Sequence, residues 1–272
     1  MIRRFLLAFQ FLTVVPVRVR GDVTGRELAA SAAFFPAVGA FQGLVTGISA
    51  FLAMKVLPAD IVAAVALTLL ILSNYGFDLD GLADTFDGLA IKSSGHEDED
   101  RKKRLMVMKD SATGATGVIA LVVTILLKYV LMKSLLADFS SLCAASLLFL
   151  MPVFSKWVAV PVMSGASSAR PDGLGRIFIE HSRAGDVALA TAVLAAFCLP
   201  FVLLGLPGPT RLTTLAMCLS LLILLSLFGL PAARFLGKRF GGLTGDHFGA
   251  LVEASEVIFL TAAYVWLRLA VS

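Results

Sequence analysis

Charged residues are scarce in this chain. Only 15% of its 272 residues are Asp, Glu, Lys or Arg, whereas 58% are hydrophobic and the mean hydropathy is +0.90. Soluble globular domains have an apolar share of roughly 45–50% and about a quarter charged residues. The composition therefore excludes an ordinary soluble protein and predicts an all-α, polytopic bundle of helices embedded in a membrane.

Cysteine and histidine are also rare, and neither shows a recognisable pattern. The three cysteines stand alone within apolar runs, without the paired spacing of a zinc site or a disulfide framework, so they are predicted to be small core residues. The three histidines show no ligand spacing and are predicted to lie in loops. These residues are Cys143, Cys198, Cys218, His96, His181 and His247.

A nucleic-acid motif is absent as well, although the net charge is +4 and the pI is 9.1. Basic residues beside membrane spans have a simpler interpretation, because they set the topology. On the side of the amino terminus lie 17 of the 23 lysines and arginines. This bias predicts that the amino terminus and the long polar loops face the cytoplasm.

Long apolar runs dominate the rest of the chain. Seven of them approach the ~20 residues that a spanning helix needs. They cover roughly Ser31 to Met54, Ile61 to Phe77, Gly117 to Leu136, Leu142 to Met163, Val187 to Leu206, Leu212 to Leu230 and Ala250 to Val271. The segment from Met1 to Val17 predicts an interfacial or partly inserted helix that ends near Pro16. No intervening loop is apolar enough to form its own core, so residues 1–272 are predicted to form one domain.

The most distinctive stretch runs from Asp78 to Gly88. If the preceding apolar helix continues, Asp80, Asp84 and Asp87 fall within about 60° of one another, and Asp78 points to the opposite side. Three like charges on one face repel each other, and a divalent cation would relieve that repulsion. Oxygen ligands with no nearby Cys or His indicate Mg²⁺ or Mn²⁺. The alternative is a helix cap and solvated loop at the membrane surface.

Three further loops have small and charged residues suited to phosphate. Lys109 to Gly117 could present free backbone N–H groups at a helix start, or serve only as an N-cap and flexible entry to the next span. Arg170 and Arg176 belong to a loop suited to bidentate phosphate contacts. The stretch from Gly241 to Gly249 is a second close-approach loop, or simply a turn at the membrane.

The sequence does not identify the partners of several charged residues. Lys128 and Lys156 lie within predicted spans, where a cation must snorkel or pair. We expect Lys128 to snorkel, whereas for Lys156 both outcomes stay open. Glu253 and Glu256 share one helical face at the start of the last span. The acidic and then basic run from His96 to Arg104 predicts a solvated loop.

These motifs resemble the cobalamin synthases, that is, the adenosylcobinamide-GDP ribazoletransferases. The resemblance rests on Asp80 to Gly88, on Met108 to Ser111 with Gly114 and Gly117, on Ala169 to Gly175, and on Gly241 to Asp246. Phe11 and Phe35 match the opening part of the family. Asp78 and Lys156 depart from the pattern, in which His and Arg are common at those positions.

The resemblance implies a Mg²⁺-dependent membrane enzyme. Such an enzyme joins adenosylcobinamide-GDP to α-ribazole or its 5′-phosphate, giving adenosylcobalamin or its phosphate and GMP. Attack of a ribose hydroxyl on a pyrophosphate requires a metal ion, cations and a carboxylate base. Asp80, Asp84, Asp87 and Asp110 are predicted to be the metal-binding and catalytic residues. The predicted substrate- and phosphate-binding residues are Lys109, Gly114, Lys156, Arg170 and Asp246.

Two rival functions use similar residues. A CDP-alcohol phosphotransferase also has acidic helices on membrane spans, but Asp84-Thr85 stands where that pattern requires Ala-Arg. A divalent cation transporter could bind its ion at the same aspartates, although transporter sites tend to lie near the bilayer midplane. The aspartates here follow a short run and are predicted to lie at the membrane edge. The oligomeric state stays open.

Overall fold

The computed structural model describes residues 1–271, which form helices and no strands apart from one isolated bridge between Ser168 and Leu243. The helices are α1 (Ile2–Leu12), α2 (Gly25–Ser31), the 3₁₀ turn η1 (Ala32–Phe34), α3 (Phe35–Ala53), α4 (Ala59–Leu72), α5 (Phe77–Leu89), α6 (Glu97–Val107), α7 (Ala115–Asp138), α8 (Ser141–Gly165), α9 (Leu174–His181), α10 (Ala184–Leu204), α11 (Arg211–Phe240) and α12 (Gly245–Val271). Within these residues six helices are long and apolar enough to cross a membrane, or seven if the bent pair of α4 and α5 is one span. The predicted all-α membrane bundle is confirmed.

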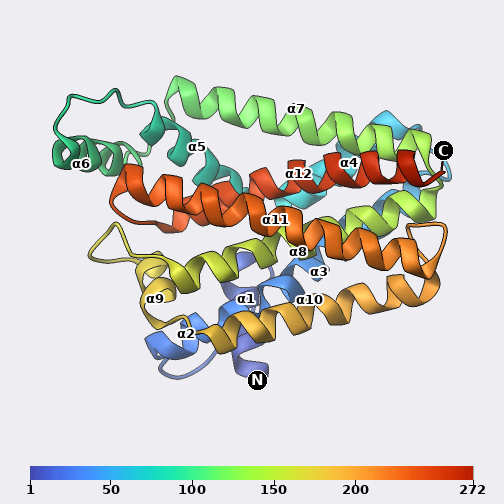
Figure 1. Cartoon of the computed structure of the whole chain (residues 1–272), viewed down its shortest axis with the longest axis horizontal. Helices are drawn as coiled ribbons and strands as arrows, with labels where there is room; N and C mark the ends of the chain where they lie inside the picture. Colours follow the sequence, from blue (N-terminus) through green and yellow to red (C-terminus); the bar gives the residue numbers. More distant parts are fainter. Residues whose placement is uncertain (272) are drawn as a thin grey trace.

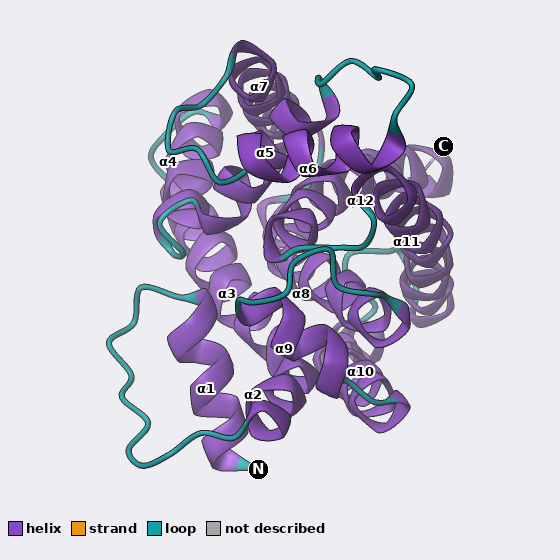
Figure 2. Cartoon of the chain, turned by 90° about the vertical axis from the view of Figure 1, so that its left-hand side faces the viewer, coloured by secondary structure: helices purple, strands orange, loops and turns teal. Residues whose placement is uncertain are grey.

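Helix α8 occupies the centre of the bundle, with the other long helices around it (Figure 2). Its most apolar window is 94% buried, whereas that of α10 is only 17% buried. Gly39 and Gly43 let α3 approach α8 closely, because an added Cβ would come within 2.1 Å and 2.2 Å of the carbonyl oxygens of Pro152 and Phe149. Small residues at such contacts are typical of membrane helix pairs.

The segment between α4 and α5 breaks the helix that the sequence predicted to be continuous. The two helices are bent by 83°. Tyr75 and Gly76 adopt left-handed backbone conformations, with φ of 55° and 70°, and the Asn74 side chain accepts a hydrogen bond from the Gly76 N–H group. The prediction of an uninterrupted helix is therefore wrong at this turn. Helix α5 itself is regular, so the spacing argument for its aspartates still applies.

All the polar loops with predicted site residues lie at one end of the bundle. Figure 1 shows this end on the left, where α6 and α9 lie, while the opposite end has only short connections between long helices. Helix α1, which ends at Leu12 rather than near Pro16, runs across the direction of the long helices there and buries Leu7 and Ala8. The loops before α5, α7, α9 and α12 can therefore contribute to one site.

The stretch from His96 to Arg104 is not a solvated loop, because most of it forms α6. Four acidic residues occupy its first turn, where they complement the helix dipole. Asp100 accepts hydrogen bonds from the hydroxyl groups of Ser93 and Ser94 and from the Ser94 N–H group, which lower its pKa to about 2. Arg104 is buried and donates to the Arg239 carbonyl, which fixes α6 against the end of α11.

Candidate active site

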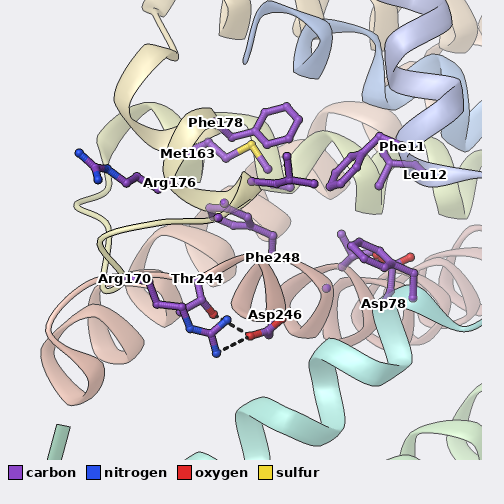
Figure 3. A pocket seen from close by; sticks show the side chains of 18 of the residues that line it. Phe11, Leu12, Asp78, Met163, Arg170, Arg176, Phe178, Thr244, Asp246 and Phe248 are labelled. Carbon is purple, nitrogen blue, oxygen red and sulfur yellow. Dashed lines mark hydrogen bonds and ion pairs between the residues drawn. The ribbon is translucent and has the colours of Figure 1, made fainter. Parts of the chain in front are cut away.

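A cavity of about 450 Å³ lies at the polar-loop end of the bundle. Residues from α1, α3, α5, α8, α9 and the start of α12 line it, together with the loops before α7 and α9 (Figure 3). A volume of this size is in the usual range for small-molecule sites. Four of the predicted site residues line it, namely Lys109, Lys156, Arg170 and Asp246, whereas the predicted aspartates of α5, Asp110 and Gly114 do not. Asp78, which was predicted to lie outside the site, lines it as well.

One wall of the cavity is aromatic. The ring centroid of Phe178 lies 5.2 Å from that of Phe11 and 5.6 Å from that of Phe35, and Phe77 lies 5.5 Å from Phe11. Phe248 from α12 also lines the cavity. This wall offers flat, apolar surface suited to a planar ring. The sequence indicated only Phe11 and Phe35, and only through the resemblance, because the other rings come from helices far apart in the chain.

The opposite wall is polar and centres on Arg170. Its Nη2 atom lies 3.2 Å from Oδ2 of Asp246, which also accepts a hydrogen bond from the Thr244 hydroxyl (Figure 3). The Nε and Nη2 atoms of Arg170 are buried and make no hydrogen bond. Arg170 also lines the cavity, so its guanidinium brings a positive charge to this wall. Lys109 adds a second cation to this part of the cavity.

A buried ion pair forms part of the cavity wall. Lys156 Nζ is 2.5 Å from Oδ2 of Asp78, and the Asn74 amide donates to the same oxygen at 2.6 Å. Lys156 and Asp78 are 1% and 4% exposed, so the lysine pairs and does not snorkel. The face of α5 opposite Asp80 thus belongs to the cavity. The sequence assigned no role to that face.

The predicted metal-binding face of α5 does not line the cavity, because Phe77 and Asp78 are the residues of this helix that reach it. Asp80 is exposed and Asp84 is half-buried, and neither carboxylate has a hydrogen-bond or ion-pair partner among residues 1–271. The carboxylates of Asp246, Asp80 and Asp87 repel that of Asp84, while the Arg170 guanidinium attracts it. Two unpaired carboxylates thus stand beside the polar wall.

Asp87 has a different environment from its two neighbours on that face. It is buried, and its two carboxylate oxygens accept hydrogen bonds from the N–H groups of Gly114 and Gly117, each at 2.7 Å. A Cβ atom on either glycine would come within 2.5 Å of this carboxylate. The N–H groups predicted to be free for a phosphate therefore bind a protein carboxylate at the start of α7.

Asp110 lies outside the cavity. It is exposed and accepts a hydrogen bond from the Ala112 N–H group in its own loop. Within residues 1–271, no group of three or more Asp, Glu, His or Cys residues is arranged to hold a metal ion. The four predicted aspartates are therefore not gathered into one centre, and their roles as metal ligands stay predictions.

A second buried charge cluster lies between α7 and α12. Lys128 Nζ is 2.5 Å from one oxygen of Glu253 and 2.5 Å from one oxygen of Glu256, and all three residues are at most 5% exposed. The expectation that Lys128 snorkels is wrong, because α12 supplies two acids on the face that the sequence identified. His247 is also not a loop residue. It is fully buried in α12, where its Nδ1 atom accepts the Thr244 N–H group.

Comparison with known proteins identifies the family. A family profile described as cobalamin-5-phosphate synthase matches residues 4–264. The chain belongs to this family. Similar curated proteins are the adenosylcobinamide-GDP ribazoletransferases of Thermodesulfovibrio yellowstonii (33% identical, covering 96% of this chain and 95% of the relative) and Geotalea daltonii (33%, 96% of each). That of Pseudomonas aeruginosa is 35% identical and covers 96% of this chain and 97% of the relative. No solved structure matches the chain.

Proposed function

We propose that this protein is a membrane-bound adenosylcobinamide-GDP ribazoletransferase. It joins adenosylcobinamide-GDP to α-ribazole or its 5′-phosphate. A ribose hydroxyl oxygen forms a bond to the phosphorus next to the cobinamide, the bond from that phosphorus to the bridging oxygen breaks, GMP leaves, and a carboxylate takes the hydroxyl proton. One observation carries the proposal: in a chain of this family, Lys109 and the ion pair of Arg170 with Asp246 line the same cavity as an aromatic wall.

The cavity fits the reacting parts of the substrates. Its volume of about 450 Å³ suits a nucleoside and a pyrophosphate but not an entire corrinoid as well. We assign the aromatic wall around Phe178 to the planar base of ribazole, and the wall with Arg170 and Lys109 to the pyrophosphate. The corrinoid ring then stays outside the cavity, beside the bilayer.

The unpaired carboxylates of Asp80 and Asp84 fit a hard divalent cation. Mg²⁺ is commonly bound by one or two carboxylates together with substrate phosphates, so a site with three protein ligands is not required. When bound there, Mg²⁺, or Mn²⁺ in its place, would neutralise the negative charge that develops on the leaving GMP. Both carboxylate oxygens of Asp87 already accept hydrogen bonds from the start of α7, so Asp87 could bind the cation only through their remaining lone pairs.

Two cations of the cavity wall, Lys156 and Arg170, are each held in place by an aspartate. Asp78, which also accepts a hydrogen bond from the Asn74 amide, fixes the ammonium group of Lys156. Asp246 orients the Arg170 guanidinium. Both arrangements are formed before substrate arrives, which is the condition for strong electrostatic stabilisation of a transition state.

We also propose that the polar-loop end faces the cytoplasm of a bacterial inner membrane. The bias of basic residues toward this end supports the assignment. Reporter fusions after Lys103 and Gly175 are expected to report a cytoplasmic location, and a fusion after Ala137 the opposite side. Periplasmic activity of the Lys103 fusion would overturn the orientation.

The decisive experiment is GMP release by membranes that contain the protein, supplied with adenosylcobinamide-GDP and α-ribazole. Wild-type membranes are expected to release GMP, and Asp84→Asn membranes are not. Asp60→Asn is the matched control, because Asp60 is an exposed carboxylate at the opposite end whose only partner among residues 1–271 is Lys133 at 3.5 Å. Uptake of divalent metal into vesicles without GMP release would favour a transporter instead.

A further inference from the structure

A second groove lies on the outer side of the loops that form the active site. It has a volume of about 410 Å³ and lies between the end of α8, the last third of α11 and the chain segments next to Ser167 and Leu243. Its floor is apolar, with Pro161, Val162 and Leu230 among the lining residues. Helices α8 and α11 run side by side here, and α11 is largely uncovered, since only 28% of its apolar window is buried.

The charge of the groove has one sign. Arg234 and Lys238 line it, four residues apart on α11, and both are exposed with no hydrogen-bond or ion-pair partner among residues 1–271. No Asp or Glu lines the groove, and neither α8 nor α11 contains an acidic residue. The groove therefore combines an apolar floor with two unpaired cations at its rim.

These cations lie at the level of lipid headgroups. Helix α11 has 30 residues, so it is about 45 Å long, whereas the hydrocarbon core of a bilayer is about 30 Å thick. If the apolar run ends at Leu230, Arg234 and Lys238 lie roughly 6 Å and 12 Å beyond it. Exposed Leu227 and Phe235 indicate that this side of α11 faces lipid.

We propose that this groove binds an anionic phospholipid, with its phosphate between Arg234 and Lys238 and one acyl chain along the apolar floor. Basic pockets between membrane helices on the cytoplasmic side are suited to acidic headgroups. A zwitterionic lipid would bring its own cation to a rim that already has two. The inference does not depend on the proposed enzymatic activity.

The lipid would lie directly behind the active-site loops. Leu243 lines the groove, donates its N–H group to the Ser167 carbonyl at 2.8 Å and accepts the Ala169 N–H group at 2.9 Å. These two hydrogen bonds join the loop that contains Arg170 to the loop that leads into α12 and Asp246. A lipid in the groove would thus support the backbone pair that holds the polar wall of the cavity.

The test measures lipid binding to the purified full-length protein by native mass spectrometry, with phosphatidylglycerol and phosphatidylcholine of identical acyl chains. Wild type is expected to retain phosphatidylglycerol at least tenfold more strongly than phosphatidylcholine. The double variant Arg234→Gln/Lys238→Gln should lose roughly 10- to 30-fold in phosphatidylglycerol binding. The matched control is Lys102→Gln/Lys103→Gln, which removes two exposed cations at the same end but outside the groove, and it should bind as wild type does.

A third variant tests the shape of the groove without changing its charge. Gly237 lines the groove, and a Cβ added there meets nothing within 4 Å, so Gly237→Leu fits the helix and fills the groove with both cations intact. It should also lose phosphatidylglycerol. Equal loss in the Lys102 and Lys103 control, full binding by Gly237→Leu, or displacement of the lipid by millimolar inorganic phosphate would overturn the proposal. The proposal would also be overturned if wild type formed a dimer that Arg234→Gln/Lys238→Gln did not form, with lipid binding unchanged.

Discussion

Two lysines are buried at membrane depth in this protein, and their surroundings differ. Lys128 lies between Glu253 and Glu256, two acids for one cation, and none of the three lines the cavity. Lys156 has a single partner in the described part of the chain, Asp78, and both residues line the cavity. One cluster is closed within the bundle, whereas the other is part of a surface that a ligand can touch.

The comparison shows that burial of a charge does not by itself identify a functional residue. Both lysines are 1% exposed, and both would be costly without a partner. Their difference is access: Lys156 can exchange part of its interaction with Asp78 for a contact with substrate, and Lys128 cannot. We therefore assign Lys128 to the stability of the bundle and Lys156 to the reaction.

The largest effect is expected for Lys128→Met. It leaves two glutamates buried without a cation, and removing one partner of a buried ion pair costs roughly 3–5 kcal/mol. The yield of monodisperse protein in detergent should fall sharply, as measured by size-exclusion chromatography. The triple variant Lys128→Met/Glu253→Gln/Glu256→Gln should recover most of the yield. If the triple variant recovers the yield but not GMP release, the cluster has a role beyond stability.

Asp84→Asn should give the next largest effect, and on activity alone. The substitution removes a carboxylate that has no partner in the protein, so the fold loses little, while GMP release should fall by roughly 10²-fold or more. Binding of Mn²⁺ in the presence of adenosylcobinamide-GDP, followed by electron paramagnetic resonance, should weaken in parallel. Normal turnover at matched expression would remove Asp84 from the site.

The double variant Lys156→Met/Asp78→Asn sharpens the comparison directly. It removes both charges of the pair, so no unpaired charge stays buried, and thermal stability should stay close to that of wild type. GMP release should nevertheless fall by at least about tenfold, because the ammonium group facing substrate is lost. Helical spacing alone would make Asp78 dispensable, whereas the ion pair makes it a positioning residue. Full activity of the double variant would show that this pair, like Lys128, has only a structural role.

The smallest effect is expected in the polar wall. Lys109→Ala and Arg170→Ala should each raise KM for adenosylcobinamide-GDP by about tenfold, and more than KM for α-ribazole, because both cations are assigned to the pyrophosphate. Steady-state kinetics with each substrate varied in turn would measure this. Arg211→Ala, at the opposite end of the bundle, is the control. Equal changes in both KM values would argue against the assignment.

The sequence predicted the parts of the site that depend on local geometry. Helical spacing placed Asp80 and Asp84 on one face, and the basic loops were assigned to the same end as that face. Which residues pair across helices could not be predicted, because the rotation of each helix about its axis depends on packing with its neighbours. Asp78 with Lys156, and Asp87 with the start of α7, are both pairings of this kind.

The break before α5 was missed although the sequence has a sign of it. Ser73, Asn74 and Gly76 interrupt the apolar run just before Phe77, and Asn and Gly favour turns. The turn itself depends on the left-handed conformations of Tyr75 and Gly76. The two positions that depart from the family pattern, Asp78 and Lys156, contact each other in the structure. Because the two residues contact each other, their departures from the family pattern concern one ion pair and not two unrelated sites.

The short α4 has a consequence for where the two substrates meet. Its 14 residues extend about 21 Å, some 9 Å less than the hydrocarbon core, before the chain turns by 83° into the acidic helix. If α4 begins at the far membrane surface, its end lies about 9 Å below the near one, and the carboxylates of α5 and the cavity then lie in a notch beside the bilayer. A bulky, partly apolar molecule that partitions into the bilayer can reach this notch sideways, while a nucleoside enters from the aqueous side, so that neither has to leave its own phase before they react.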